Sequence, residues 1–392
     1  HKIAFFISHP IQYYTPFFQI LNSDLRIDLT VYFCFKGASE NYADPEFGIE
    51  IKWDRLPLEG YKSIFLKNYS LKPGISFFGM INPGIIKELK REKYAAIIVH
   101  GYNILSHWLA FWAAWRSKTP IILKGEADLL NLEQIPLLKK IVKKFILRNL
   151  FKRIDAFLYA YALNKDFFKF YDVPERKLFF YPCAVNNDFF GMEADKIRPK
   201  RESIKQKLGI KTNLPVVLFV GKFIPRKRVF DLLKATLVIR GIQFNTLLVG
   251  DGVLKEDLLQ FIKQNNLSNT HLFDFKNQSE LPEFYAVADL LVLPSEQDPS
   301  PKVINEAMNF SLPIITTDKV ATALDLLIKT KSGFTYPVGD INIFAESLEK
   351  LLTNQKLREE MGQNAFKTVQ SWSFEHDVTG VIKALEYIKS KK

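Results

Sequence analysis

The sequence predicts an α/β protein with two doubly wound, Rossmann-like domains. Short apolar runs rich in β-branched and aromatic residues alternate with longer amphipathic stretches, which is typical of parallel sheets with crossover helices. The apolar runs fall into two series along the chain. At 392 residues, the chain is also about twice as long as one ordinary domain.

The predicted strands follow one another at the intervals expected of βαβ units. In the first series they cover 2–7, 28–33, 95–99, 120–123, 156–159 and 178–180. In the second series they cover 216–220, 245–249, 270–275, 290–293 and 313–316. The alternation lapses into a polar and charged stretch at 186–201, which indicates a domain boundary. We therefore expect domains at 1–187 and 188–372, with a closing helix at 373–392 that returns to the first domain.

The composition is that of a folded protein with a basic surface. Apolar residues make up 47% and charged residues 24%, and the net charge of +12 favours an anionic partner such as nucleotide phosphates, acidic lipid or nucleic acid. Cys34 and Cys183 are the only cysteines, too few for a disulfide framework, which favours a reducing, cytoplasmic location. The sequence shows neither a secretory signal nor an apolar run long enough to span a bilayer.

The segment after the strand 290–293 is the most informative for chemistry. A polar loop carries Asp298 and Ser300 to a helix that is expected to begin near Pro301. The N–H groups of Lys302 and Val303, with the positive end of the helix dipole, would form an anion site. Glu306 lies one turn further on, and an ordinary surface ion pair between Lys302 and Glu306 is the alternative.

This segment resembles the signature of family 4, GT-B type retaining glycosyltransferases. The shared features are a strand, Pro-Ser, an acidic residue, and then Glu-Ala-Met before Leu-Pro-Ile-Ile, with Asp298 eight positions before Glu306. The resemblance implies that Asp298 contacts the hydroxyls of the donor sugar and that Glu306 holds the ribose of the nucleotide. The chain departs from the pattern at Asp298, usually Glu, and at Pro301 and Ser311, both usually Gly.

A basic loop after the strand 216–220 extends the resemblance. It contains Gly221, Lys222 and Lys227, and it could be no more than a solvated loop of four cations. The family has Gly-Arg and then Lys at this place, so the resemblance implies that Lys222 and Lys227 grip the donor diphosphate. Lysine in place of arginine keeps the charge and loses the bidentate geometry.

Two further positions of the second half fit the same donor domain. Gly250 belongs to a Gly-Asp-Gly stretch after the strand 245–249, where a plain turn is the simpler interpretation. Phe275 stands at the end of the strand 270–275, and the resemblance implies that this end frames the nucleobase.

The first half offers weaker candidates for the acceptor side. His100 follows the strand 95–99, and the resemblance implies that it points at the transferred sugar, although a histidine at a strand end is often structural. His9, Gln12 and Tyr13 follow the first strand and are expected to face the ligand, although the Gly-Gly frequent in the family is absent here. Glu126 could bind acceptor hydroxyls or cap the next helix.

The stretch 137–153 carries seven cations and no acid among apolar residues at helical spacing. It predicts either an ordinary core helix with a basic side or a helix that touches anionic lipid headgroups. Nucleic acid is not an expected partner, because the aromatic residues fall within the predicted strands and helices and are not interleaved with exposed cations.

The leading hypothesis is a retaining glycosyltransferase that uses a UDP- or GDP-sugar as donor and a glycan or lipid-linked acceptor, in the synthesis of a cell-surface polysaccharide or glycolipid. No Asp-x-Asp occurs, so we expect no metal or other cofactor. We also expect a cytoplasmic location, with the basic helix at the inner face of the membrane. The alternatives are a nucleotide-sugar epimerase, a glycan phosphorylase or a non-catalytic nucleotide-sugar-binding module. The donor base, the sugar, the acceptor, the linkage and the oligomeric state are not defined by the sequence.

Overall fold

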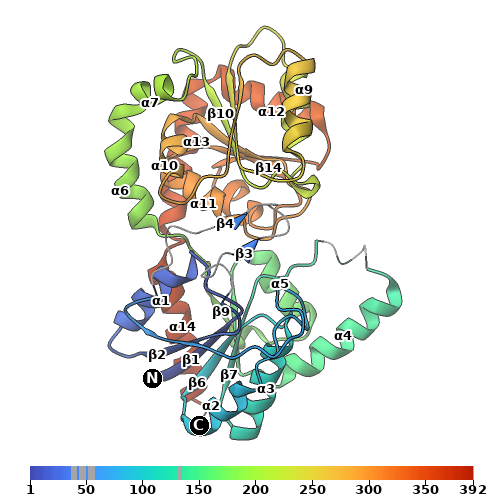
Figure 1. The fold of residues 1–392 in the computed structure, drawn as a ribbon, viewed down its shortest axis with the longest axis vertical. Helices are drawn as coiled ribbons and strands as arrows, with labels where there is room; N and C mark the ends of the chain where they lie inside the picture. The colour runs from blue at the N-terminus through green and yellow to red at the C-terminus, as the bar shows by residue number, and fades with distance from the viewer. Residues whose placement is uncertain (37–41, 44–49, 52–57, 131, 133–134, 392) are drawn as a thin grey trace. The chain divides into compact units, whose positions relative to one another are not determined.

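The structure is a computed structural model that describes residues 1–36, 42–43, 50–51, 58–130, 132 and 135–391 (Figure 1). The chain divides into two compact units. Unit 1 comprises the described residues of 1–42, 55–183 and 374–392, and unit 2 those of 43–54 and 184–373. Relative to the expected domain boundary after 187, the division falls four residues earlier, after Cys183.

Unit 1 contains a seven-stranded parallel sheet in the order β5-β2-β1-β6-β7-β8-β9. Its strands are β1 (Lys2–Ile7), β2 (Asp28–Phe33), β5 (Lys62–Phe65), β6 (Ala96–His100), β7 (Ile121–Gly125), β8 (Ala156–Tyr159) and β9 (Leu178–Phe180). Its helices are α1 (Tyr14–Ser23), α2 (Gly84–Arg91), α3 (Leu105–Ser117), α4 (Leu137–Lys152), α5 (Ala162–Phe170) and α14 (Phe374–Lys389), with a 3-10 turn at Glu175–Lys177. A separate pair of short strands is formed by β3 (Tyr42–Ala43) and β4 (Glu50–Ile51).

Unit 2 contains a six-stranded parallel sheet in the order β12-β11-β10-β13-β14-β15. Its strands are β10 (Val216–Val220), β11 (Asn245–Val249), β12 (Thr270–Phe273), β13 (Leu290–Leu293), β14 (Ile314–Thr317) and β15 (Gly333–Tyr336). Its helices are α6 (Asn187–Ile197), α7 (Arg201–Lys207), α8 (Val229–Val238), α9 (Lys255–Gln264), α10 (Leu281–Val287), α11 (Lys302–Asn309), α12 (Ile341–Thr353) and α13 (Gln355–Gln370). Short turns of 3-10 helix at Arg198–Lys200 and Pro225–Lys227 and of π-helix at Leu324–Ile328 complete it.

Both sheets reverse their strand order beside their first strand. In unit 2 the chain moves outward from β10 through β11 to β12, and then returns to place β13 on the other side of β10. Unit 1 does the same around β1 and β6. At such a reversal the loops after the two central strands diverge, and open α/β sheets bind ligands in the crevice between them. The α/β class with two doubly wound domains is therefore confirmed, and the reversals are where a binding site is expected in each unit.

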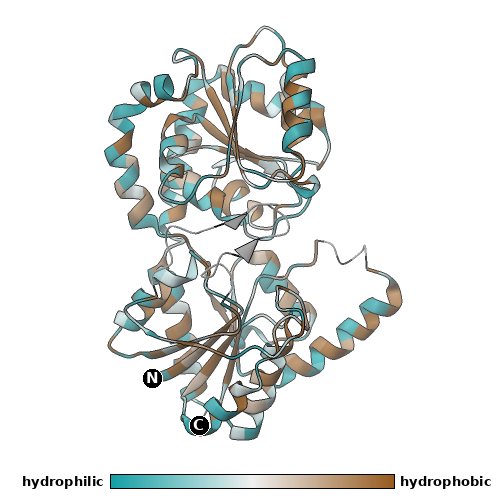
Figure 2. Ribbon diagram, in the orientation of Figure 1, coloured by the Kyte–Doolittle hydropathy of each residue, from teal (hydrophilic) through white to brown (hydrophobic). Residues whose placement is uncertain are grey.

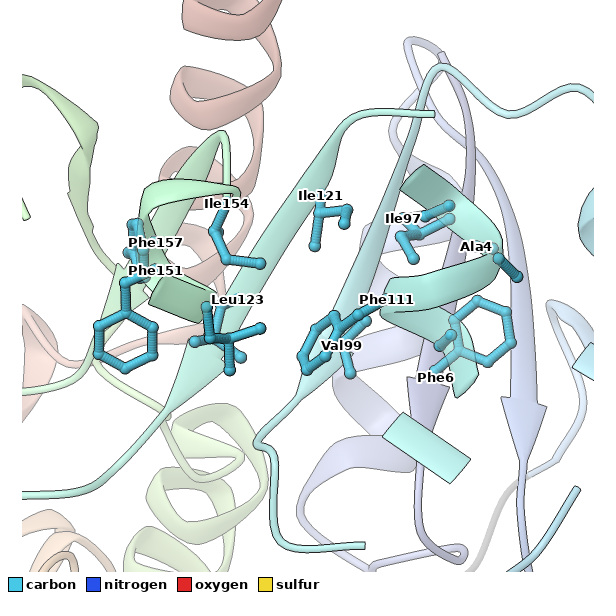
Figure 3. Close-up of a cluster of buried hydrophobic side chains, with 14 of the residues drawn as sticks. Ala4, Phe6, Ile97, Val99, Phe111, Ile121, Leu123, Phe151, Ile154 and Phe157 are labelled. Carbon is cyan, nitrogen blue, oxygen red and sulfur yellow. The ribbon is translucent and has the colours of Figure 1, made fainter. Parts of the chain in front are cut away.

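Burial of the strands stabilises both sheets. β1, β6 and β10 consist almost wholly of apolar side chains that are buried, as parallel strands covered by helices on both faces must be. Figure 2 shows these strands as brown ribbons inside each unit, and Figure 3 shows one side of the core of unit 1, where Phe6, Val99, Phe111 and Leu123 lie close together.

Helix α14 belongs to unit 1, although it follows unit 2 in the chain. It packs against β8, β9 and α1. The backbone N–H of Cys183 donates to Asp377 Oδ1 over 2.8 Å, and both residues are buried. A Cβ added at Gly380 would lie 2.1 Å from the carbonyl oxygen of Phe180, so glycine is required for this close packing. These contacts bring the end of the chain back to the sheet with which it begins.

The expected strands are all present, and two strands of the main sheets were not expected. β5 and β15 are the edge strands that sequence reasoning missed. Both are only four residues long and are partly exposed, so they lack the continuous apolar run that marks a central strand. β12 ends at Phe273, which leaves Phe275 in the following loop. No helix within the described residues is both long and apolar enough to cross a membrane.

Prediction 1 concerns His107, which is buried in α3 of unit 1. Burial lowers the pKa of His107 to about 3, whereas an unfolded chain binds this proton near pH 6.5. His107 therefore contributes stability above pH 6.5 that is lost as the pH falls toward 3, by about 1.4 kcal/mol per pH unit. Urea unfolding between pH 7 and 5 should show this loss, and His107→Phe should reduce the slope. Equal slopes in both proteins would contradict the assignment.

Candidate functional site

In unit 2 the two loops at the reversal of strand order are held together by an ion pair. Lys227 ends a 3-10 turn that follows β10, and Asp298 lies in the loop that follows β13. Lys227 Nζ donates to Asp298 Oδ2, and the two side chains are 13% and 11% exposed. A charge pair that is largely removed from water has to be satisfied by its partner and by hydrogen bonds. The structure therefore brings together two of the residues that the sequence singled out, from loops 71 positions apart.

Backbone contacts fix the same two loops. The N–H of Glu296 donates to the carbonyl of Arg226 over 2.9 Å, and the guanidinium of Arg226 donates to the carbonyl of Gln297. Asp298 also forms an isolated parallel bridge with Val320, and its carbonyl accepts from the N–H of Ala321 over 3.0 Å. The main chain of Asp298 is therefore fixed by the segment at 319–321, and its carboxylate is held by Lys227.

Glu306 lies inside the unit and not on its surface. Its side chain is fully buried on α11, and Tyr285 Oη donates to Glu306 Oε2 over 2.6 Å. The interpretation of Lys302 and Glu306 as an exposed surface pair is therefore wrong. A buried carboxylate is costly unless it is hydrogen-bonded, and the Tyr285 hydroxyl supplies one such hydrogen bond to Glu306.

The amino end of α11 lies next to this loop. The helix begins at Lys302, with Pro301 as the residue before it, one position later than the sequence predicted. Proline offers no side-chain oxygen to the N–H groups of the first turn, where Val303 lies. Lys302 Nζ donates to Ser300 Oγ over 2.9 Å, so the hydroxyl and the ammonium group stand together at the helix start. Cationic and N–H donors at one helix end suit an anion.

The remaining donor-side candidates lie at the ends of the neighbouring strands. Gly221 and Lys222 follow β10 directly, and Lys222 is half-buried. Gly250 follows β11, and a Cβ there would lie 1.9 Å from the carbonyl oxygen of Gly221. Glycine is thus required at position 250 because the backbones at 221 and 250 lie so close together. The interpretation of this stretch as a plain turn does not explain that requirement. Phe275 is half-buried in the loop after β12.

The turn after α11 explains one departure from the family pattern. Ser311 adopts φ of 57°, in the left-handed region that favours glycine. A Cβ at Gly362 would lie 2.1 Å from the Ser311 carbonyl oxygen, so helix α13 packs directly on this turn. Serine keeps the turn at a conformational cost that glycine would not incur.

Prediction 2 tests the close approach at Gly250. Gly250→Ala should lower the free energy of unfolding by about 1–3 kcal/mol, because the new methyl group overlaps the Gly221 carbonyl and the two loops must move apart. Urea denaturation measures the change. Gly191→Ala in α6 is the matched control, since its added Cβ meets nothing within 4 Å and should leave stability unchanged or raise it by up to about 1 kcal/mol. Equal effects of the two substitutions would refute the explanation.

In unit 1 the reversal of strand order carries a buried polar cluster. Lys124, in β7, is fully buried, and its ammonium group contacts Tyr14 Oη and Glu126 Oε1. The same ammonium lies 3.2 Å from His100 Nε2 and 3.4 Å from Cys183 Sγ. Tyr14 Oη in turn lies 3.3 Å from His100 Nε2 and 3.1 Å from Cys183 Sγ. Five polar side chains from separate elements thus meet at the carboxyl end of the sheet.

The cluster sets the charge state of His100. Burial, and then the positive charge of Lys124, lower the pKa of His100 well below its usual value. His100 is therefore a neutral imidazole at neutral pH. Burial likewise raises the pKa of Tyr14 well above its usual range, so that the phenol keeps its proton. A neutral histidine beside a buried ammonium group can accept or donate a hydrogen bond without carrying charge itself.

The other acceptor-side candidates lie around this cluster. Glu126 contacts Lys124 and Tyr14, which gives it a role beyond capping a helix. Tyr13 precedes α1, and His9 Nδ1 lies 3.0 Å from Ser8 Oγ. Gln12 is 6% exposed, and within the described part of the chain its Oε1 has no hydrogen-bond partner. The structure thus groups His100 with Glu126 through Lys124, and His9 is near enough for its charge to act on His100.

Sequence reasoning missed three members of the cluster, namely Tyr14, Lys124 and Cys183. Lys124 had a visible signal, because it interrupts an otherwise apolar strand and stands two positions before Glu126, on the same face. Tyr14 and Cys183 had none, because their contacts arise only when α1, β7 and the segment after β9 come together.

Prediction 3 tests the link between Lys124 and His100. Lys124→Met should raise the pKa of His100, because a neighbouring positive charge is removed, and should lower the free energy of unfolding by about 3 kcal/mol, because Glu126 loses its cation. NMR of labelled histidine and urea unfolding measure the two effects. Lys124→Met combined with Glu126→Gln should recover part of the stability. An unchanged His100 pKa in the single variant would contradict the coupling.

Within the described residues, no group of three or more His, Cys, Asp or Glu side chains is arranged to hold a metal ion. The expectation that the chain works without a metal stays a prediction. The positive charges at this site of unit 2 come from Lys227, from Lys302 and from the amino end of α11.

Comparison with known proteins gives a match over the second half of the chain. Residues 200–368 match the family model of glycosyl transferases group 1. The chain is 34% identical over 169 residues to an uncharacterized glycosyltransferase of Methanocaldococcus jannaschii, covering 43% of this chain and 47% of that protein. It is 26% identical over 188 residues to a capsular polysaccharide biosynthesis glycosyltransferase of Staphylococcus aureus, covering 46% of this chain and 48% of that protein. The chain thus spans about half the length of these curated relatives.

The fold is similar to solved structures over almost the whole chain. The HepE protein of Anabaena, solved in complex with UDP, aligns with 98% of this chain and 100% of its own, with a TM-score of 0.74 and 16% identity. A glycosyltransferase of Rickettsia africae aligns with 100% of this chain and 99% of its own, with a TM-score of 0.75 and 15% identity. These likenesses confirm the GT-B fold expected from the sequence.

Proposed function

We propose that the chain is a glycosyltransferase that moves a sugar from a nucleoside diphosphate donor to a glycan or lipid-linked acceptor, because residues 200–368 match the family model of glycosyl transferases group 1. The observation that carries this proposal is the ion pair of Lys227 with Asp298, together with the buried carboxylate of Glu306 on the helix that follows the Asp298 loop. These residues lie at the reversal of strand order in unit 2 and inside the segment that matches the family.

The donor diphosphate binds where positive charge and N–H donors converge. Lys222 and Lys227 follow β10, and the first turn of α11 begins at Lys302 with Val303 beside it. These groups would compensate the charge that develops on the departing nucleoside diphosphate. Ser300, in contact with Lys302, adds a hydroxyl donor at the same place. In this proposal the lysines and the helix end take the part that a divalent cation plays in other sugar transferases.

The acidic residues select the two sugars of the donor. Glu306 accepts hydrogen bonds from the ribose hydroxyls, and its depth on α11 excludes water from that contact. Asp298 accepts from hydroxyls of the transferred sugar, and Lys227 holds its carboxylate in place. Phe275 and the loop after β12 take the nucleobase. UDP is the preferred candidate nucleotide, because the Anabaena protein of similar fold was solved with UDP.

The transfer itself is proposed to retain the anomeric configuration, with the leaving phosphate accepting the acceptor proton. His100 is neutral, so it positions a sugar hydroxyl by hydrogen bonding and does not act as a charged acid. Glu126, Gln12, His9 and Tyr13 are the acceptor-side candidates.

A role in making cell-surface polysaccharide or glycolipid is supported by the capsular polysaccharide relative. A cytoplasmic location stays a prediction.

Prediction 4 tests the ribose contact. Glu306→Gln keeps the size of the side chain and an oxygen for Tyr285 but removes the charge, so the Kd for UDP should rise about 10- to 100-fold. Calorimetric titration of the full chain with UDP measures the change. Glu283→Gln, which alters a more exposed glutamate on α10, should bind UDP as the parent does. Equal affinities of all three proteins would place the nucleotide elsewhere.

Product analysis separates the proposal from its rivals. A transferase releases nucleoside diphosphate only when an acceptor is present. A phosphorylase forms a sugar phosphate only with inorganic phosphate, and an epimerase changes the donor sugar with no acceptor at all. A binding module binds UDP and yields no product. A thermal-shift screen over UDP, GDP, ADP and their sugars should first identify the donor, since a ligand that binds the folded form raises Tm.

A further inference from the structure

Helix α4 exposes an apolar face to solvent along its first three turns. Its side chains are buried only at Leu147, Leu150 and Phe151, near the carboxyl end. Six apolar side chains before them are 44% to 74% exposed, namely Leu137, Leu138, Ile141, Val142, Phe145 and Ile146. The interpretation of this stretch as an ordinary core helix therefore holds only for its last turns. In Figure 1 the first turns of α4 extend away from the rest of unit 1.

The spacing shows that this face is not the side of α4 that packs in the core of unit 1. Positions 138, 141, 142 and 145 form one helical stripe, and 147, 150 and 151 form the stripe that is buried. Lys140, Lys143 and Lys144 each precede one of these buried positions by seven residues, so they lie on the same side of the helix. The side that is apolar in the last turns is thus basic in the first turns. The apolar stripe of the first turns has no place in the core of unit 1.

The apolar surface continues into a neighbouring pocket. This pocket of about 460 Å³ lies between the first turns of α4 and the aromatic side chains of Tyr102 and Trp108. Leu138 and Val142 belong both to the exposed stripe and to the pocket wall, and Lys139 and Lys143 line it as well. Apolar surface and lysine ammonium groups therefore occur side by side.

The charge of the helix defines the partner. The stretch 137–153 carries seven cations and no acid. Among the described residues Arg148 pairs with Asp172, Lys144 lies over the ring of Phe170 and Lys143 acts on the charge of Asp128, so seven cations of this stretch face few carboxylates there. A partner of this helix must therefore present an apolar surface to the exposed stripe and negative charge to the lysines. A second copy of the chain docked symmetrically through α4 would bring two such basic helices together and repel.

We propose that the first three turns of α4 dock on the surface of an anionic lipid bilayer. The exposed apolar stripe enters the boundary between headgroups and acyl chains, and the lysines on the flanks contact the lipid phosphates. The cations add attraction that salt weakens. The docking does not depend on sugar transfer, so it can be tested apart from the proposed function.

Prediction 5 is tested by co-sedimentation of the full chain with vesicles of phosphatidylcholine alone or mixed with phosphatidylglycerol. Binding should require phosphatidylglycerol and should weaken as salt is raised. Leu138→Ser combined with Phe145→Ser should lower binding at least about tenfold, since two exposed side chains lose their burial in lipid. Lys140→Gln combined with Lys143→Gln should lower it about 30-fold at low salt. Leu25→Ser with Met192→Ser, which alters equally exposed apolar side chains elsewhere, should bind as the parent does.

A second measurement reports insertion directly. The parent cysteines are buried, so Ile141→Cys can be labelled with an environment-sensitive dye, and its emission should shift to the blue on the acidic vesicles. A dye at Leu25→Cys should not shift. Three outcomes would overturn the proposal: no binding to acidic vesicles at low salt, unchanged binding of the α4 variants, or a dimer in light scattering that Leu138→Ser with Phe145→Ser abolishes. The last outcome would make a second copy of the chain the partner.

Discussion

The pairing of β10 with both β11 and β13 is the constraint on which the candidate site of unit 2 depends. Because the chain reverses its direction across the sheet at β10, the loops that follow β10 and β13 leave the sheet edge side by side. The ion pair of Lys227 with Asp298 can form only there, since the two residues come from separate βα units. Glu306 is placed by the same geometry, because α11 follows β13 directly.

Close backbone approach supports this arrangement. Gly250 allows the turn after β11 to lie against Gly221, and the carbonyl of Gly221 fills the space that a side chain would occupy. The hydrogen bonds between Arg226 and the loop at Glu296 and Gln297 then fix the basic loop to the acidic one. The candidate site of unit 2 is thus held by backbone contacts, so its charged side chains would need little further ordering on binding a ligand.

The sequence was sufficient to predict the central strands. It was not sufficient to predict the edge strands or the side-chain contacts between separate helices and strands. β1, β6 and β10 are continuous apolar runs, so their positions could be predicted within one residue. β5 and β15 are short edge strands with partial exposure, and nothing in their residues distinguishes them from loops. Lys227 and Asp298 could be predicted because motif spacing marks them, whereas the contacts of Tyr14 and Cys183 with Lys124 depend on how α1, β7 and β9 pack. The depth of Glu306 likewise appears only in the folded unit.

Unit 1 is a discontinuous domain, because α14 follows unit 2 in the chain and packs on the sheet of unit 1. The hydrogen bond from the Cys183 N–H to Asp377 and the close packing of Gly380 on Phe180 hold α14 there. During synthesis, β8 and β9 emerge long before α14, and they must wait with one apolar side uncovered while unit 2 is made. Unit 2 is nearly continuous in sequence and can close its own core first. Unit 1 is therefore translated first but completes its fold last. A fragment that ends before α14 would lack a helix that packs on its first sheet.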